Sequence, residues 1–258
     1  GTVGSALALL LAGRGEEVLL LSRSGSGPEH RAVRRVVGDA SSADALMAAA
    51  GGCVAIYNCA NPRYDRWPTD WPPIAAALLA AAGSSGAVLA TVSNLYDYGP
   101  VDRPMTEDLP LAPTGPKGRT RAAMWQEALA AHEAGRVRVT EVRGSDYLCP
   151  GSQSHLGDRL MRPLLAGKKV TVLPSADTSH SWTSTEDVAA LLATVASDER
   201  AWGRAWHVPS VEPRSQREVV GDLAAAAGIG EVRVGEHPAA LLRLLGLFSP
   251  LMRELPEV

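Results

Sequence analysis

Two glycines at the start of the chain, Gly1 and Gly4, stand directly before an apolar run, residues 5–12, that is typical of a buried helix. Because glycine has no side chain, the backbone of such a turn can approach a pyrophosphate closely, and the following helix can pack closely on a strand. An ordinary turn before a helix is the alternative. In the full pattern a strand and a further glycine come first, so we expect both ahead of Gly1. The sequence therefore predicts a phosphate-binding turn made of Gly1, Thr2, Val3 and Gly4.

A serine–arginine–serine group follows the next predicted strand, residues 16–22. It stands about 20 residues after the turn, where a dinucleotide-binding fold distinguishes a ribose hydroxyl from a 2′-phosphate. A carboxylate there would bond two ribose hydroxyls and repel a phosphate, whereas a guanidinium attracts it. The alternative is a solvated surface arginine. The group Ser22, Arg23 and Ser24 contains no acid, so the sequence favours NADP(H) over NAD(H).

The elements that must position these residues alternate along the chain. Further strand-like runs are separated by Ala-rich helical stretches, which predicts an α/β fold with a Rossmann-like, doubly wound parallel sheet and a smaller C-terminal substrate lobe. The runs are almost continuously apolar, as expected where helices cover both faces of a sheet. They span residues 34–39, 53–59, 87–93 and 137–144.

After residue 150 the pattern loosens, which predicts a change of domain. We interpret residues 1–150 as the dinucleotide-binding domain and residues 151–258 mainly as a substrate-binding lobe, with some segments returning to the sheet. The elements predicted there are a helix at 156–166, a strand at 169–174, a helix at 185–197, a strand at 205–210 and two more helices.

The composition narrows the classes of partner. The 258 residues are 46% hydrophobic and 21% charged with a net charge of -3, which is globular and lacks the basic surplus of a nucleic-acid-binding protein. Three cysteines fit neither a disulfide frame nor a zinc site, so we expect reduced thiols and no metal. The apolar runs are shorter than the roughly 20 residues that span a bilayer. We therefore expect a cytoplasmic protein with a small-molecule partner and no membrane or nucleic-acid partner.

With the turn, VVGDASS (36–42) and YNCANP (57–62) in place, the chain resembles the extended and atypical short-chain dehydrogenases/reductases, in particular the NAD-dependent epimerase/dehydratase family. The resemblance covers nearly the whole chain and includes TVSNLYDYGP (91–100), EVRGSDYLCPG (141–151) and HSWTSTEDVA (180–189). It implies a homodimer formed through a pair of helices. It also implies adenine contacts at Asp39 and Ala40 and adenosine-ribose contacts at Cys59, Ala60 and Asn61.

The catalytic pattern of that family is altered here. The family places Ser or Thr five residues before the Gly of Tyr-Gly, and this position is Asn94, next to Ser93. Its Tyr and Lys, four residues apart on a later helix, align with Lys117 and Arg121. Neither is a phenol, and arginine does not give up its proton in a protein. A solvated basic helix start is the alternative to a functional pair.

The resemblance nevertheless implies roles for these positions. Asn94 would polarise a substrate oxygen. Lys117 and Arg121 share one helical face and would anchor the nicotinamide ribose, beside Ser93. The proton would come from a nearby tyrosine, Tyr96 or Tyr98.

An aromatic segment, residues 61–73, follows the predicted ribose contacts. We expect an exposed loop there that serves as a lid or pocket wall. A structural plug against a neighbouring helix, or a dimer contact, is the alternative. Candidate substrate residues are Tyr64 and Trp67 in this segment and Tyr147, His180 and Trp182 further on.

These observations lead to one main hypothesis and two alternatives. The main hypothesis is an NADP(H)-dependent, oxidoreductase-like enzyme with a non-standard catalytic site, acting on a small carbonyl, hydroxyl or sugar-like substrate. The first alternative is a non-catalytic NAD(P)-binding sensor or partner-binding module. The second is an epimerase or dehydratase that retains its cofactor.

Overall fold

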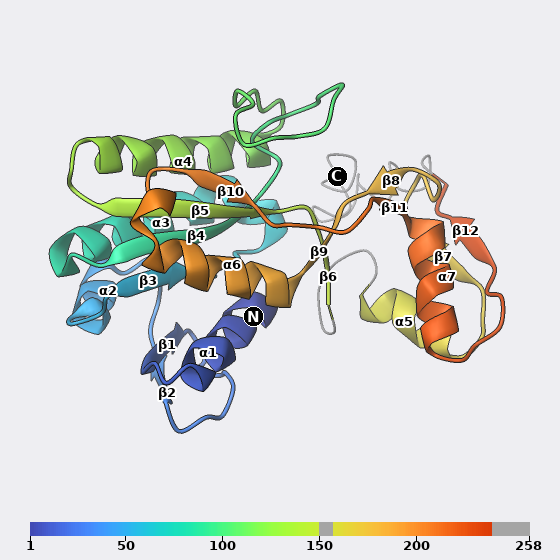
Figure 1. The fold of residues 1–258 in the computed structure, drawn as a ribbon, viewed down its shortest axis with the longest axis horizontal. Helices are drawn as coiled ribbons and strands as arrows, with labels where there is room; N and C mark the ends of the chain where they lie inside the picture. Colours follow the sequence, from blue (N-terminus) through green and yellow to red (C-terminus); the bar gives the residue numbers. More distant parts are fainter. Residues whose placement is uncertain (150–156, 239–258) are drawn as a thin grey trace. The chain divides into compact units, whose positions relative to one another are not determined.

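The computed structural model describes residues 1–149 and 157–238, whose contacts divide into two units. The first unit contains Gly1–Gly144 and Glu186–Val208, and the second contains residues 145–185 and those from 209 on. Figure 1 shows helices and mainly parallel strands alternating along the first unit. The predicted α/β class is confirmed.

The first unit is built on a four-stranded parallel sheet in the order β10-β5-β4-β3. Among the four strands, the two central ones carry the fully buried apolar residues, and they share a core with the helices α2 (Ala43–Ala50), α3 (Trp67–Ser85) and α4 (Pro116–Glu133). This burial explains the continuous apolar runs of the sequence. The strands are β3 (Ala55–Asn58), β4 (Val88–Asn94), β5 (Arg138–Gly144) and β10 (Ala205–His207).

A separate parallel pair, β1 (Val18–Ser22) and β2 (Val33–Val37), lies beside α1 (Thr2–Gly13) in the same unit. Within the described residues β1 is hydrogen-bonded to β2 and β3 to β4, and β1 and β3 do not pair with each other. Residues of α1, β1 and β3 instead line one cavity of about 2340 Å³. The lining follows β1 and β3 along their whole length and includes the residues after the carboxyl ends of β1, β2 and β3.

The prediction of an exposed loop at residues 61–73 is wrong. Its residues form a 3-10 turn, η1 (Tyr64–Arg66), and the first turns of α3, in which Trp67 and Trp71 are buried. Pro72 and Pro73 lie inside the helix and each removes a backbone donor. Burial of two tryptophans four residues apart on one helical face outweighs that loss, so the alternative of a structural plug fits the packing.

The chain returns to the first unit through α6 (Thr185–Ser197), a short turn η2 (Glu199–Ala201) and β10. The helix predicted at 185–197 has these bounds, and the strand predicted at 205–210 ends at His207. The residue after β10 is still hydrogen-bonded to the sheet, since the Val208 amide donates to the Arg143 carbonyl at 3.0 Å.

In the described part of the second unit, three two-stranded ladders combine with two helices. Its apolar core includes Leu164 and Val170, which are fully buried, and Val220 from the second helix. The expected helix at 156–166 is observed as α5 (Asp158–Leu165), and one of the two later helices as α7 (Gln216–Ala226). The strands are β6 (Asp146–Leu148), β7 (Val170–Val172), β8 (Ser179–His180), β9 (Trp182–Ser184), β11 (Arg214–Ser215) and β12 (Val234–Glu236).

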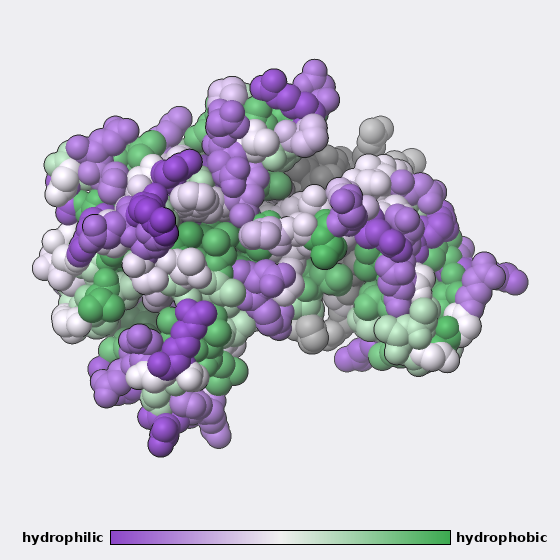
Figure 2. All heavy atoms as spheres, viewed as in Figure 1, coloured by the Kyte–Doolittle hydropathy of each residue, from purple (hydrophilic) through white to green (hydrophobic). Residues whose placement is uncertain are grey.

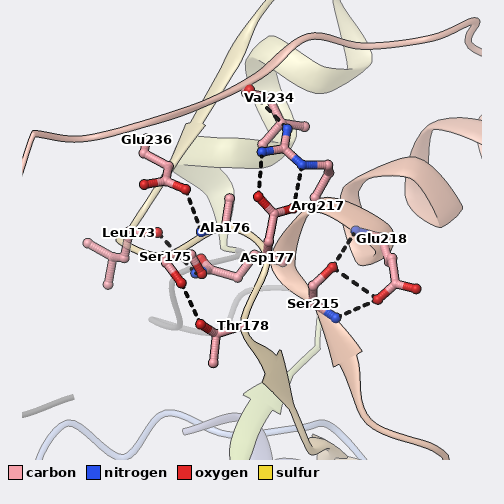
Figure 3. Close-up of polar contacts among 11 residues, drawn as sticks. Leu173, Ser175, Ala176, Asp177, Thr178, Ser215, Arg217, Glu218, Val234 and Glu236 are labelled. Carbon is pink, nitrogen blue, oxygen red and sulfur yellow. Dashed lines mark hydrogen bonds and ion pairs between the residues drawn. The ribbon is translucent and has the colours of Figure 1, made fainter.

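Polar contacts join α7 to the turn after β7 (Figure 3). Arg217 donates two hydrogen bonds to Asp177, at 2.7 and 3.1 Å, and a third to the Val234 carbonyl at 3.2 Å. The helix begins with a reciprocal pair of hydrogen bonds between Ser215 and Glu218, which satisfies backbone donors at its start. These contacts fix α7 against the strands of its own unit.

Figure 2 shows hydrophilic and hydrophobic residues interspersed over the visible face of each unit. Within the described part of the chain, every helix is too short or too polar to cross a bilayer.

Candidate functional site

Most of the predicted cofactor residues line the one large cavity of the first unit. Its lining includes the N-terminal glycines of α1 and the loops that follow β1, β2 and β3. Carboxyl ends of neighbouring parallel strands form the usual ligand crevice of an open α/β sheet. The predicted residues found there are Gly1, Gly4, Ser22, Arg23, Asp39, Ala40, Cys59, Ala60 and Asn61; Thr2, Val3 and Ser24 lie beside them in the chain.

The start of α1 is closely packed against the loop after β3. A Cβ atom added to Gly4 would lie 3.3 Å from the Cβ of Cys59, so glycine permits this approach. The first turn of α1 carries no acidic residue, and its first backbone N–H groups have no partner inside the helix. Burial raises the pKa of Cys59 to about 12, so the thiol beside the turn stays neutral. The turn therefore presents amide donors without a competing negative charge.

Arg23 and Asp39 follow β1 and β2 at the same end of the pair. Arg23 is exposed, whereas Asp39 accepts hydrogen bonds from the Ser41 amide at 2.9 Å and its hydroxyl at 2.8 Å. Those bonds, together with the nearby charge of Arg23, lower the pKa of Asp39. At this end of the pair the cavity thus carries the exposed guanidinium of Arg23 next to an ionised acid that is already bonded to its own turn.

Three candidate residues lie at the end of β4 and in the turn that follows it. Ser93 is buried, Asn94 is half-buried, and the Asn94 side-chain oxygen accepts from the Tyr96 amide at 3.3 Å. Tyr96 is half-buried and receives a hydrogen bond from the Tyr64 hydroxyl at 2.9 Å. The structure therefore brings Tyr64 and Tyr96 together from segments that lie 32 residues apart.

The two cations of α4 are buried against aromatic rings. Lys117 is 1% exposed, with Nζ 4.3 Å from the centroid of the Tyr64 ring. Arg121, one turn later, lies over Trp67 at 4.5 Å and Trp71 at 4.2 Å and donates to the Val92 carbonyl at 3.3 Å. Both cations therefore face the interior of the unit, and the alternative of a solvated basic helix start does not describe them.

Gly118 allows α4 to come this close to the turn after β4. A Cβ at this position would lie 2.3 Å from the Tyr96 carbonyl oxygen and 2.9 Å from the Pro113 Cβ. No side chain fits in that space without moving backbone. The glycine next to Lys117 therefore sets the distance between the α4 cations and the two tyrosines.

The residue after Tyr96, Asp97, belongs to a buried cluster of three charged side chains, none of which is among the predicted site residues. Arg143 Nη2 pairs with Asp97 at 2.8 Å, and Arg143 Nε donates to Glu141 at 2.8 Å. All three side chains are almost completely buried. Burial raises the pKa of Asp97, and it raises the pKa of Glu141 to about 7. A sequence signal existed, because Glu141 and Arg143 are two residues apart and therefore share one face of the strand predicted at 137–144.

Tyr98 belongs to the same buried region. Its side chain is 1% exposed, its hydroxyl is 2.8 Å from His207 Nε2, and burial raises its pKa. Gly99, which follows it, has a φ of 71°, and a Cβ there would meet the Ala112 carbonyl oxygen. Tyr98 is thus held in the packing between the turn and β10.

The remaining candidates lie in the second unit. His180 Nδ1 is 2.8 Å from Asp146, and this hydrogen bond raises the pKa of His180. Trp182 is buried and donates to the Arg214 carbonyl at 2.8 Å, and Tyr147 lies in β6. Pro150 and Gly151, part of the resemblance, lie outside the described residues.

The family of the chain follows from a comparison with known proteins. A model of the NAD dependent epimerase/dehydratase family matches residues 1–208. The chain belongs to this family. The resemblance inferred from the motifs is confirmed. A search of curated proteins finds no match.

Solved structures confirm the fold of this epimerase/dehydratase-family protein. The epimerase Mth375 from Methanothermobacter thermautotrophicus has a TM-score of 0.81 at 18% identity, over 92% of this chain and 76% of that one. UDP-glucose 4-epimerase from Thermotoga maritima gives 0.79 at 15%, over 92% and 82%. A dTDP-glucose 4,6-dehydratase from Streptomyces venezuelae, with NAD bound, gives 0.75 at 23%, over 92% and 82%. At these identities the likeness shows the fold alone.

The residues of this family member fit a nicotinamide dinucleotide. The start of α1 offers amide donors, and the close approach of Gly4 to Cys59 leaves little room for a side chain at position 4. The exposed guanidinium of Arg23 lies on the rim of the same cavity. Donors for phosphate groups and a cavity therefore occur together at the ends of the strands.

Proposed function

We propose that this protein is an NADP(H)-dependent enzyme that transfers a hydride to or from a carbonyl or hydroxyl carbon of a small or sugar-like substrate. The observation that carries the proposal is Arg23, an exposed cation on the rim of the glycine-lined cavity, after a strand that ends without an acid. A guanidinium matches the geometry and charge of a phosphate, so it favours a 2′-phosphate over a free hydroxyl. The other cavity residues would hold the pyrophosphate, adenine and ribose.

When bound, the nicotinamide supplies or accepts the hydride. The chain's own contribution is at the end of β4. The Asn94 amide is a hydrogen-bond donor that would polarise the substrate oxygen. Of the two tyrosines predicted to donate the proton, Tyr96 is favoured, since Tyr98 is 1% exposed and its hydroxyl is engaged by His207. The catalytic site is non-standard because Lys117 and Arg121 are packed on aromatic rings where the family has Tyr and Lys.

Titration of the purified protein with NADPH and NADH tests this proposal. If Arg23 binds the 2′-phosphate, Arg23→Ala should weaken NADPH binding by roughly 1.5 to 3 kcal/mol, the range for a hydrogen bond to a charged group, and leave NADH binding unchanged. Arg136→Ala, which removes an exposed cation elsewhere in the unit, is the matched control. Equal losses for both nucleotides would contradict the 2′-phosphate assignment, and no binding of either would contradict the proposal itself.

A second candidate is an epimerase or dehydratase that keeps its cofactor through the reaction. It is favoured by the solved structures of similar fold, which are epimerases and dehydratases, one of them with NAD bound. The two candidates differ in how firmly the nucleotide is held. Acid precipitation of the freshly purified protein should release a stoichiometric nucleotide if the second candidate is correct, and almost none if the cofactor exchanges freely.

A further inference from the structure

The two hydroxyl groups of Tyr64 and Tyr96 form one unit beside the predicted cofactor cavity. Tyr64 Oη donates to Tyr96 Oη at 2.9 Å, and the two rings meet edge to face with centroids 6.4 Å apart. Residues on both sides of Tyr64, namely Pro62, Arg63 and Arg66, line the cavity. Both tyrosines are half-buried, so the pair is not enclosed in the packed interior.

A buried ammonium group lies over the ring of one member of this pair, Tyr64. Lys117 Nζ is 4.3 Å from the centroid of the Tyr64 ring, and Lys117 is 1% exposed. At that distance, in surroundings poorer in water than the surface, a positive charge favours the ionised form of a neighbouring phenol. Lys117 stands at the position where the family has its tyrosine. In this chain a cation therefore occupies that position, and the phenol beside it is that of Tyr64.

The other charged groups around the pair are paired with each other. On the side of Tyr64, Asp65 is bonded to Arg63 at 2.9 Å. On the side of Tyr96, Asp97 is bonded to Arg143 at 2.8 Å. From α4, Arg121 adds a second positive charge one turn beyond Lys117. Both acids are thus balanced by arginines, and Lys117 is the cation that the structure places over the Tyr64 ring.

We propose that Tyr64 and Tyr96 act together as the proton donor of the active site, and that Lys117 is the fixed cation that stabilises the phenolate they leave. This inference rests on the proposed function. It assigns Tyr64, expected as a substrate contact, to the proton path, and it gives Lys117, expected to anchor the nicotinamide ribose, an electrostatic role.

The proton balance of the reducing direction follows from the hydrogen bond. A substrate carbonyl that has gained a hydride is an alkoxide and takes a proton from Tyr96 Oη as that O–H bond breaks. Tyr64 Oη then passes its own proton to Tyr96 along the 2.9 Å hydrogen bond. The negative charge comes to rest on Tyr64 next to Lys117, and a proton from water restores the pair. The oxidising direction is the reverse.

Carbon-13 NMR of the five tyrosines, labelled at Cζ, tests the inference without a substrate. Each signal is assigned by its loss in the matching Tyr→Phe variant. We expect the Tyr64–Tyr96 pair to begin ionising at a pH below the unperturbed value of about 10. Lys117→Met should raise that midpoint by about one pH unit or more, and Lys117→Arg should largely preserve it. Arg119→Met, which removes an exposed cation from the same helix, should leave it unchanged.

A second titration links the pair to the cofactor. Saturating NADP⁺ should lower the midpoint further, because its nicotinamide ring is positively charged, while adenosine 2′,5′-bisphosphate, which lacks that ring, should not. The inference is overturned if the ionisation midpoint is unchanged by Lys117→Met or by bound NADP⁺. Failure to bind either nucleotide instead overturns the proposed function, and the Lys117 comparison still reports on the tyrosine pair.

Discussion

A buried cation requires something to replace the water that it loses. In this protein aromatic rings take that place for both cations of α4, the Tyr64 ring for Lys117 and two tryptophan rings for Arg121. Cation–π contacts gain strength when they are desolvated, up to about 2 kcal/mol each. The aromatic segment after β3 and the basic start of α4 therefore pack against each other through cation–π contacts.

The buried acid Glu141 predicts a pH dependence of stability. Burial raises its pKa from 4.5 in the unfolded chain to about 7 in the fold, so the folded state holds the proton more tightly. The sign follows from linkage: stability falls as the pH rises through the window from 4.5 to 7 and is flat above it. Each pH unit of difference corresponds to about 1.4 kcal/mol, so the loss is up to about 3 kcal/mol. Urea unfolding at pH 5 and pH 8 measures it.

Glu141→Gln provides the control for that measurement. Its side-chain oxygen can still accept the hydrogen bond from Arg143 Nε, but it has no proton to lose in this range. The variant should therefore show a smaller decrease in the free energy of unfolding between pH 5 and pH 8. An identical decrease in the variant and the parent would show that other groups cause it.

At the scale of single residues, the sequence predicts those positions that belong to local motifs. Gly4, Arg23 and Asn61 follow from position relative to strands, and the structure places all three on one cavity. The contact of Tyr64 with Tyr96 and the pairing of Arg143 with Asp97 join segments far apart in the chain. No local pattern encodes such contacts, because they depend on which strands become neighbours.

At the scale of elements, the close approach of α4 to the turn after β4 depends on a glycine inside the helix, Gly118. A Cβ on Gly118 would lie 2.3 Å from the Tyr96 carbonyl oxygen, so Gly118→Ala must displace backbone. Overpacking of this kind costs about 1 to 3 kcal/mol. We expect a lower free energy of unfolding in urea, accompanied by a shift in the Tyr96 NMR signal.

Gly221 is the matched control, since it lies inside α7 and has no neighbouring atom within 4 Å of an added Cβ. Gly221→Ala should stabilise the protein by about 0.5 to 1 kcal/mol, because alanine is the better helix former. If both substitutions change stability in the same direction, helix propensity rather than the close approach governs Gly118.

Predicted and observed elements agree best where the apolar pattern is long and unambiguous. The runs at 87–93 and 137–144 become β4 and β5 within one residue at each end. The segment at 61–73 differs because its prolines suggested a loop, whereas buried tryptophans make it helical. Local propensity predicts such a segment poorly, because the packing partner that decides its structure is α4, more than 40 residues later in the chain.

At the scale of the whole molecule, the cavity of the first unit has an apolar lining that is only partly protected from water. The apolar residues of β1 that line it are half-buried, and Val54, just before β3, is exposed. Parallel strands are normally paired on both edges and covered on both faces. The open edges of β1 and β3 and these lining residues indicate a place for one more parallel strand. Large apolar side chains elsewhere in the unit are exposed as well. The exposed residues are Leu9 at 45%, Val37 at 70%, Met47 at 37% and Val54 at 82%.

An extended chain tests that interpretation of the sheet. We expect an apolar strand of about six residues, joined to Gly1 through a glycine turn, to pair with both β1 and β3. The backbone amides of these strands would gain partners, and the half-buried leucines of β1 would lose their contact with water. Hydrogen exchange at residues 18–22 and 55–58 should slow markedly and the melting temperature should rise. An extension of equal length made of glycine and serine is the control. Equal exchange in the two proteins would mean that the cavity between β1 and β3 does not accept a strand, and that the sheet of the first unit ends at β3.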